Sequence, residues 1–293
     1  MSFHVNSICL PCLLLHSVNE LPEVKDEEKK MAFVRELMQR LSCVPEDLSA
    51  PEIDLENRKL AQRYFGPNEE NYLREKKLSN EFALARLDSI KARIAKADDK
   101  IFAALQFAIL GNYIDFSALQ ENVDFQELED MLDSAQSITF DMDCYTHFLD
   151  QLRTGKRLLY IADNAGEICF DRLMAETLQA HFPHLQITFC VRGALAKNDA
   201  TMEDAKLVGI PFPIVETGDG VCGTNLKVLP EETKKAFREA DVILSKGQGN
   251  VETLWGSGYN IFYAFLVKCP RFMTTFQKPK MTPMFIQEKD LTP

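Results

Sequence analysis

Polar residues of a few types follow the short apolar segments in the second half of this sequence. Asp163 and Asn164 follow the first such segment, residues 192–199 follow the second, Thr217 and Asp219 follow the third, and Lys246 follows the fourth. Carboxylate and amide oxygens suit a hard or borderline divalent cation such as Mg²⁺ or Mn²⁺. A lysine and the free amides of a helix N-terminus suit a phosphate group. One such loop alone indicates a turn with a helix cap, but several loops that meet at one sheet edge favour a binding site.

The elements that position these residues are predicted from the spacing of apolar side chains. Short apolar strands alternate with helices, and the strands are expected over residues 157–162, 186–191, 213–216, 241–245 and 261–267. This alternation is typical of right-handed βαβ units, which form a parallel sheet covered by helices on both faces. In such a sheet, ligands bind outside the carboxyl ends of the strands, and the polar residues above lie at those ends.

The first half of the chain has a different periodicity. Apolar residues recur with helical spacing in three segments, which are residues 27–41, 69–96 and 98–111. No comparable strand pattern occurs before about residue 135, so this half is expected to be mostly helical. We therefore predict a helical N-terminal region over residues 1–150 and an α/β domain that binds metal and phosphate over residues 151–293.

Composition excludes several classes of function. The 293 residues include 44 acidic and 33 basic side chains, which gives a net charge of −11. Such a surface repels a polyanion, and no cluster of basic residues offers a patch, so nucleic-acid binding is disfavoured. The eight cysteines are mostly scattered singly in apolar stretches, which is typical of free thiols in a reducing compartment. Without a signal-peptide pattern or an apolar run near ~18 residues, we expect a cytoplasmic protein that does not span a membrane.

Three other motifs invite a function and are weaker. Residues 218–223 fit the Gly-x-Gly-x-x-Gly pattern of dinucleotide-binding folds, but no clean helix follows them. Asp141 and Asp143 resemble the Asp-x-Asp of aspartyl-phosphate phosphatases, although a helix-like stretch follows instead of a sheet unit. Cys9 and Cys12 form a single Cys-x-x-Cys that could bind zinc or be redox active. Packing of the two thiols at a helix start is the preferred interpretation.

Several segments together resemble the damage-control phosphatase family, formerly a domain of unknown function. The opening Cys-Leu-Pro-Cys is similar to the start of its prokaryotic and archaeal-type branch. The other segments that carry the resemblance are Asp-Asn-Ala-Gly-Glu at 163–167, Arg-Gly at 192–193, Asn-Asp-Ala-Thr at 198–201, Lys-Gly-Gln-Gly-Asn at 246–250 with Glu252, Gly-Asn-Tyr-Ile-Asp at 111–115, and the spaced Tyr72, Lys76 and Asn80. The resemblance covers nearly the whole chain and is least close after Pro270.

The resemblance implies a helical N-terminal region beside a Rossmann-like, three-layer α/β/α domain. It also implies one divalent metal ion, which could be Mn²⁺, Co²⁺, Ni²⁺ or Mg²⁺, held by Asp163, Asn164 and Asp199. The implied activity is the hydrolysis of phosphate monoesters of small metabolites, including sugar phosphates and damaged or side-product phosphometabolites. Direct attack by water and a phospho-enzyme intermediate both remain open.

The remaining motif residues are expected to act on the substrate. Lys246 is predicted to hold a phosphate oxygen, with a pairing to Asp219 or Glu252 as the structural alternative. Glu167 is predicted to orient a substrate hydroxyl or a metal-bound water. Asn112 and Asp115 are predicted to reach in from the helical region, with Asp115 as the general acid or base.

Two other classes of function compete with the phosphatase. Distant eukaryotic relatives of the family have been linked to protein carboxyl methylation, which makes an S-adenosylmethionine-dependent carboxyl methyltransferase the second candidate, alongside a nicotinamide enzyme. A non-catalytic module that binds metal or metabolite is the third. The expected partner in the preferred hypothesis is a small-molecule phosphate ester, and the oligomeric state is left open by the sequence.

Overall fold

The computed structural model of the chain describes residues 3–23, 25–113, 130, 133, 135 and 138–288. Its first part is helical, as expected. The helices before the sheet are α1 (Cys9–Asn19), α2 (Glu27–Ser42), α3 (Ala50–Phe65), α4 (Glu69–Leu84), α5 (Leu87–Lys96), α6 (Lys100–Leu110), the 3-10 turn η1 (Gly111–Tyr113) and α8 (Met142–Thr154).

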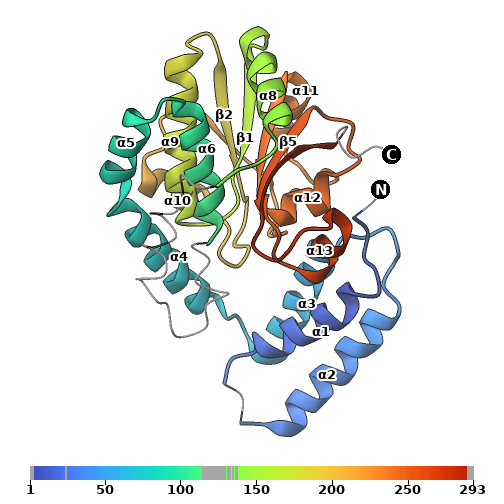
Figure 1. Cartoon of the computed structure of the whole chain (residues 1–293). Helices are drawn as coiled ribbons and strands as arrows, with labels where there is room; N and C mark the ends of the chain where they lie inside the picture. Colours follow the sequence, from blue (N-terminus) through green and yellow to red (C-terminus); the bar gives the residue numbers. More distant parts are fainter. Residues whose placement is uncertain are drawn as a thin grey trace.

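The second part alternates strands and helices around one six-stranded sheet (Figure 1). The strands are β1 (Arg157–Ile161), β2 (Gln186–Val191), β3 (Ile214–Glu216), β4 (Val242–Lys246), β5 (Ile261–Leu266) and β6 (Pro283–Gln287). The helices between them are α9 (Glu167–His181), α10 (Met202–Val208), α11 (Glu231–Glu239), α12 (Gln248–Leu254) and α13 (Pro270–Phe276). The strand order is β3-β2-β1-β4-β5-β6, and the first five strands are parallel. The expected strands are thus confirmed, and β6 adds an antiparallel edge strand that the sequence did not reveal.

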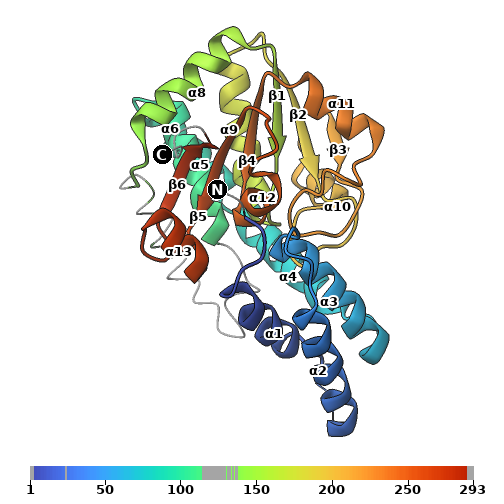
Figure 2. The same cartoon turned by 90° about the vertical axis from the view of Figure 1, so that its right-hand side faces the viewer.

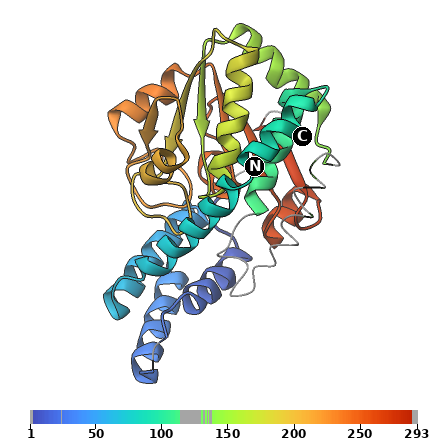
Figure 3. The same ribbon diagram turned by 90° about the vertical axis from the view of Figure 1, so that its left-hand side faces the viewer.

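Helices cover both faces of the sheet, which confirms the three-layer architecture. Side chains alternate along each strand, so Leu158 and Tyr160 face one layer while Leu159 and Ile161 face the other. The first layer contains α4, α5, α6, α8, α9 and α10 and is turned toward the viewer in Figure 3. The second contains α11, α12 and α13 and is seen in Figure 2. Phe3 joins this second core, which ties the start of the described chain to the sheet.

Helices α1, α2 and α3 form a separate group with a small apolar core of their own. That core includes Leu13, Phe33, Leu37, Ile53 and Leu60. The group lies at one end of the sheet, below it in Figure 1. No helix in the described ranges is long and apolar enough to cross a membrane.

Helices before residue 150 and the first strand after it share part of one core. Phe82 of α4 and Leu105 of α6 belong to the same apolar cluster as Phe148 of α8 and Leu158 of β1. Within the first half, α1 to α3 therefore pack separately, whereas α4 to α8 pack with the sheet. The division of the chain at residue 150 stays a prediction.

Candidate active site

The loop after β1 carries the first two predicted ligands and is shaped by a glycine contact. Asp163 and Asn164 are both buried, with 8% and 5% of their surface exposed. The carboxylate of Asp163 packs against Gly247 so closely that a Cβ there would lie 1.9 Å from Asp163 Oδ2. Gly247 also has a φ of +79°, which glycine adopts without strain. The start of the Lys-Gly-Gln-Gly-Asn segment is therefore built to accommodate the Asp163 side chain.

The loop after β2 brings Asp199 beside this pair. Residues Asn164 and Asp199 form an isolated antiparallel bridge, and the amide of Ala200 donates to the carbonyl of Asp163 at 2.7 Å. The amide of Ala165 donates to the carbonyl of Asn198 at 2.8 Å. Backbone hydrogen bonds thus fix the two loops to each other, and the three predicted metal ligands are brought together as expected.

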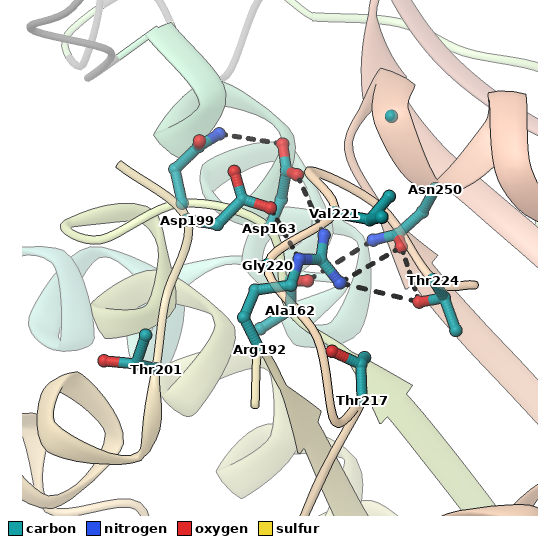
Figure 4. Close-up of polar contacts among 12 residues, drawn as sticks. Ala162, Asp163, Arg192, Asp199, Thr201, Thr217, Gly220, Val221, Thr224 and Asn250 are labelled. Carbon is teal, nitrogen blue, oxygen red and sulfur yellow. Dashed lines mark hydrogen bonds and ion pairs between the residues drawn. The ribbon is translucent and has the colours of Figure 1, made fainter. Parts of the chain in front are cut away.

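Arg192, the residue that follows β2, holds the two carboxylates in place (Figure 4). Its Nε donates to Asp199 Oδ2 at 2.5 Å, and its Nη2 lies 3.6 Å from Asp163 Oδ1. On the other side, Nη1 donates to Asn250 Oδ1 at 3.3 Å and reaches Thr224 Oγ1 at 3.5 Å. The Arg192 side chain has no exposed surface, so it acts as a buried positioning residue with a fixed orientation.

Burial and mutual repulsion both disfavour the charged forms of the two carboxyl groups. Burial is the main cause that raises the pKa of Asp163 well above its usual range, and the carboxylates of Asp199 and Glu167 add to it. Burial also raises the pKa of Asp199, although Arg192 opposes the shift. A cation placed between these groups would relieve both effects.

Glu167 lies behind the predicted ligands and fixes two amides. Its Oε2 accepts hydrogen bonds from Asn112 Nδ2 at 2.7 Å and from Asn164 Nδ2 at 3.1 Å. The same two amide groups also donate to Asp163 Oδ2, at 2.9 Å and 2.7 Å. Glu167 is completely buried. It is therefore placed to orient Asn112 and Asn164, and its predicted contact with a substrate hydroxyl or a metal-bound water stays a prediction.

Lys246 is also placed differently from the prediction. Its Nζ donates to Glu167 Oε1 at 2.6 Å, to Asp171 Oδ1 at 2.7 Å and to the carbonyl of Ala108 at 2.6 Å. These three acceptors match the three protons of an ammonium group, and the residue is fully buried. Lys246 therefore lies beneath α9 with its donors in use. The alternative pairing of Lys246 with Asp219 or Glu252 does not form. The buried ammonium lies next to the two carboxylates of α9 and pairs with them instead.

The predicted ligands open into a pocket of about 300 Å³ that the N-terminal helices help to enclose. Asp163, Asn164, Asp199 and Asn112 line one side. The other lining side chains come from α1, α3, α12 and the loops beside them, and they include Cys12, His16, Glu20, Asp54, Lys197, Cys222, Gln248, Glu252 and Lys268. Its volume lies at the lower end of the range for small-molecule sites. Carboxylates and cations are therefore both present around the space in front of the ligands.

The outer wall of this pocket is held by an ion-pair network. Lys197 Nζ contacts Glu20 Oε1, directly after α1, at 2.8 Å and Asp54 Oδ1 of α3 at 3.0 Å. His16 also contacts Glu20, at 3.4 Å. Burial acts to raise the pKa of Glu20, but the hydrogen bond from His16 and the charge of Lys197 outweigh it and lower the pKa to about 2. Since Lys197 stands two residues before Asp199, the network ties the helical group to the ligand loop.

Helix α4 fixes both ligand loops from the opposite side. Asn80 accepts a hydrogen bond from the amide of Gly166 at 2.7 Å and donates to Asp204 Oδ1 at 2.8 Å. Lys76 pairs with Asp204 Oδ2 at 2.7 Å and donates to Thr201 at 3.1 Å. These family-like residues therefore support the loops after β1 and β2 and lie outside the set of predicted ligands.

Comparison with known proteins now identifies the family. The family model of the damage-control phosphatase ARMT1-like domain matches residues 5–282. This chain belongs to that family. A damage-control phosphatase of Archaeoglobus fulgidus is 31% identical over 90% of this chain and 92% of its own length. A damage-control phosphatase of Pyrococcus horikoshii is 31% identical over 73% of each chain. A crystal structure of a DUF89 family protein from P. horikoshii superposes with a TM-score of 0.81 at 26% identity, covering 97% of this chain and 99% of the other.

The match to the damage-control phosphatase family extends over both halves of the fold, including α1 to α3. The names of its relatives support a phosphatase role at the level of the family. Substrate and metal are not part of those names. The chemistry of the site in this family member has therefore to be argued from its own side chains.

The side chains of this damage-control phosphatase family member suit a divalent cation. Four carboxyl groups, those of Asp163, Asp199, Glu167 and Asp171, share the two buried cations Arg192 and Lys246 in the described part of the chain. Fully ionised, they would leave two negative charges uncompensated. The side-chain Oδ1 of Asn112 is buried and finds no hydrogen-bond donor among the described residues. Both observations fit a bound cation with oxygen ligands.

The competing motifs take structural roles where they are described. Asp141 is the N-cap of α8, and its Oδ1 accepts from the amides of Asp143 and Cys144. Residues 218–223 form a loop without a following helix, as expected from the sequence. Cys9 is buried in the core of α1 to α3, whereas Cys12 lines the pocket.

A zinc site at the Cys-x-x-Cys finds no support within the described residues, where no three His, Cys, Asp or Glu side chains are grouped to hold a metal by themselves.

Asp115, the predicted general acid or base, lies outside the described residues. Its role stays a prediction. The further active-site role of Arg192 and the presence of Lys268 in the pocket were missed by the sequence reasoning. Lys268 follows β5 at the same edge as the other loops, which is the signal that could have identified it.

Proposed function

We propose that this protein is a metal-dependent phosphatase that hydrolyses phosphate monoesters of small metabolites. One divalent cation, Mn²⁺, Co²⁺, Ni²⁺ or Mg²⁺, binds between Asp163, Asn164 and Asp199. The observation that carries the proposal is the pair of buried carboxylates that share Arg192 at the bottom of the pocket. Two carboxylates kept side by side in a buried site without full compensation are a costly arrangement, which a divalent cation makes favourable.

The ligand atoms are the carboxylate oxygens of Asp163 and Asp199 and the amide oxygen of Asn164. Since the amide nitrogen of Asn164 donates to Asp163 and Glu167, its oxygen is the atom left for a cation. When bound, the cation neutralises charge on the phosphoryl oxygens of the ester. Arg192 keeps the two carboxylates at the correct separation. Glu167, itself held by Lys246, prevents the amides of Asn112 and Asn164 from rotating.

Lys268 is the proposed contact to the phosphoryl group, in place of Lys246. It lines the pocket, and its ammonium acts to lower the pKa of Asp163 against the larger effect of burial. A lysine in the same pocket as the predicted ligands can bind an equatorial phosphate oxygen as a point charge. Replacing Lys268 by Met is expected to lower kcat/KM on the order of a hundredfold, whereas Lys227→Met, at an exposed ion pair, should change it less than twofold.

The substrate class follows from the outer part of the pocket. Carboxylates and cations alternate there, on Glu20, Asp54, Lys197 and His16. Such a wall offers hydrogen-bond donors and acceptors to a polyhydroxylated leaving group, and its volume accommodates a small one. We therefore place sugar phosphates and related phosphometabolites in the substrate class.

The test is phosphate release from a panel of sugar phosphates, with p-nitrophenyl phosphate as a reference ester. The protein is first treated with a chelator and then assayed with each of the four metals. Release is expected only with added metal, and Asp163→Asn should abolish it together with metal binding measured by calorimetry. Asp141→Asn is the matched control, because Asp141 caps α8 outside the pocket and Asn is an equally good cap.

Two outcomes would contradict the proposal. One is phosphate release that persists after complete removal of metal, and the other is an Asp163→Asn variant that keeps most of the activity. Binding of S-adenosylmethionine without phosphate release would favour the methyltransferase alternative. Binding of metal and sugar phosphate without turnover would favour the non-catalytic module.

A further inference from the structure

Glu252 lies in the active-site pocket at a position that none of the roles above uses. It belongs to α12, which begins directly after Gly247, the residue that packs against the carboxylate of Asp163. Gln248 and Glu252 are one helical turn apart on α12, and both line the same pocket as Asp163. Helix α12 therefore begins beside Asp163 and places the carboxyl group of Glu252 in the wall of the pocket.

The surroundings of Glu252 leave its carboxyl group with little compensation. Only 10% of its side chain is exposed. The nearest cation is Arg271 of α13, whose Nη1 lies 3.9 Å from Glu252 Oε1, too far for a hydrogen bond. That same Nη1 donates to the carbonyl of Phe3 at 3.0 Å. Within the described residues, no hydrogen bond to the Glu252 carboxyl group is formed.

This environment favours the protonated form near neutral pH. Burial raises the pKa of Glu252 to about 7, and Arg271 opposes the shift. Other titratable groups face it from α1, from α3 and from the segment that precedes α13. They are Cys12 and Cys269, whose thiols feel the charge of Glu252, and Asp54 and Lys268, which line the same pocket. A carboxyl group with these properties is suited to donate a proton at physiological pH.

We propose that Glu252 is the general acid of the reaction, which protonates the leaving oxygen as the phosphorus–oxygen bond of the ester breaks. The inference rests on the proposed phosphatase function and adds a residue to it. Water supplies the new oxygen on phosphorus, and the Glu252 proton passes to the departing alkoxide, which leaves as an alcohol. The dihydrogen phosphate formed returns one proton to the Glu252 carboxylate and leaves as hydrogen phosphate, so that atoms and charge balance.

The experiment compares two esters that differ in how much they need an acid. Glycerol 2-phosphate has a poor leaving group, whereas p-nitrophenolate leaves without protonation. In Glu252→Gln, kcat/KM for glycerol 2-phosphate is expected to fall at least a hundredfold, and that for p-nitrophenyl phosphate less than fivefold. Glu239→Gln, at an exposed pair with Arg157 on the protein surface, is the matched control and should alter neither value.

The pH dependence of the wild-type protein gives a second measurement that needs no variant. The acid must be protonated to act, so kcat/KM for glycerol 2-phosphate should fall tenfold per pH unit above about pH 7, whereas the nitrophenyl ester should lack this limb. In Glu252→Gln the limb should disappear. This measurement keeps the inference testable if the variant does not fold.

The outcomes separate the inference from the proposed function. If the wild-type protein with metal releases phosphate from neither ester, both are overturned. If it hydrolyses both esters and Glu252→Gln lowers the two rates equally or leaves both unchanged, the general-acid role alone is overturned. The selective loss of glycerol 2-phosphate hydrolysis in Asp115→Asn instead would assign the acid to Asp115.

Discussion

Replacing Lys246 by Met is expected to destabilise the protein strongly, because the lysine compensates buried carboxylates. Its ammonium contacts Glu167 Oε1 and Asp171 Oδ1, and none of the three side chains has any exposed surface. Burial lowers the pKa of Lys246, but the two carboxylates outweigh this effect, so the net shift is upward. The lysine is therefore charged, and its removal leaves Glu167 with a buried negative charge.

The magnitude follows from the cost of an unpaired buried charge. Removing one partner of a buried ion pair typically costs about 3–5 kcal/mol. Glu167 Oε2 would keep its two amide donors, from Asn112 and Asn164, but Oε1 would lose its partner. We expect Lys246→Met to lower the free energy of unfolding by about 3–5 kcal/mol at pH 7, on the order of 10 °C in Tm for a chain of this length.

Urea denaturation of the metal-free protein measures this loss without interference from bound cation. The double variant Lys246→Met/Glu167→Gln removes both charges, and about half or more of the lost stability should return.

The reasoning about Lys246 is refuted by one combination of results. If Lys246→Met unfolds within about 1 kcal/mol of the wild type and binds metal normally, yet loses more than a hundredfold in kcat/KM, the lysine acts on the substrate. In that case its contacts with Glu167 and Asp171 would describe a resting arrangement that opens during the reaction.

Three further predictions follow from the site and its walls. Gly247→Ala should abolish metal binding, measured by calorimetry, because the new methyl group would overlap the Asp163 carboxylate. The control is Gly256→Ala, which has a similar φ of +82° and no atom within 4 Å of the new methyl group. It should cost only about 1–2 kcal/mol of stability in urea denaturation. The free energy of unfolding of the wild-type protein should fall by at most about 3 kcal/mol as the pH falls from about 4.5 toward 2. Glu20 has a lowered pKa in the folded state, so it stabilises the fold only while it is ionised. Glu20→Gln should flatten this part of an acid-denaturation curve. Alkylation with N-ethylmaleimide should block phosphate release through Cys12, the more exposed of the two pocket thiols Cys12 and Cys222. Cys12→Ser should therefore be resistant, while Cys43→Ser, at an exposed thiol outside the pocket, remains sensitive.

The parallel strands could be predicted because each is a short apolar run with a helix on both sides. β1 and β4 are buried from both faces over most of their length, so their apolar runs at 158–161 and 242–244 stand out in the sequence. β6 follows a different rule. It is a short edge strand that begins with Pro283 and pairs antiparallel with β5, and neither alternation nor a helix precedes it clearly in the sequence. Tertiary pairing decides its conformation.

The loop that carries Asp163 could be predicted for the same reason as the strands, because Asp163 closely follows β1 at the edge of the sheet. Asp199 lies eight residues after β2, and its bridge to Asn164 brings it to the same edge. The direction of a longer side chain is not determined in this way. Lys246 could extend toward the pocket or beneath α9, and the choice depends on Asp171, which α9 places one turn after Glu167. The place of Cys12 in the pocket could not be predicted from the sequence either. It is about 150 residues away from Asp163 in sequence, yet α1 folds against the pocket.

Arg192 explains why the site needs a cation of its own in addition to any bound metal. Asp163 and Asp199 come from different loops, and the repulsion between their carboxylates opposes the backbone hydrogen bonds that join those loops. The guanidinium contacts both carboxylates from below and is itself fixed by Asn250 and Thr224, so it holds the pair together in the folded protein. Arg192 does not fully neutralise the two carboxylates, since burial and the neighbouring carboxylates still raise the pKa of Asp163 well above its usual range. The carboxylates are thereby assembled in advance and left attractive to a divalent ion, which is the combination that a preorganised metal site requires.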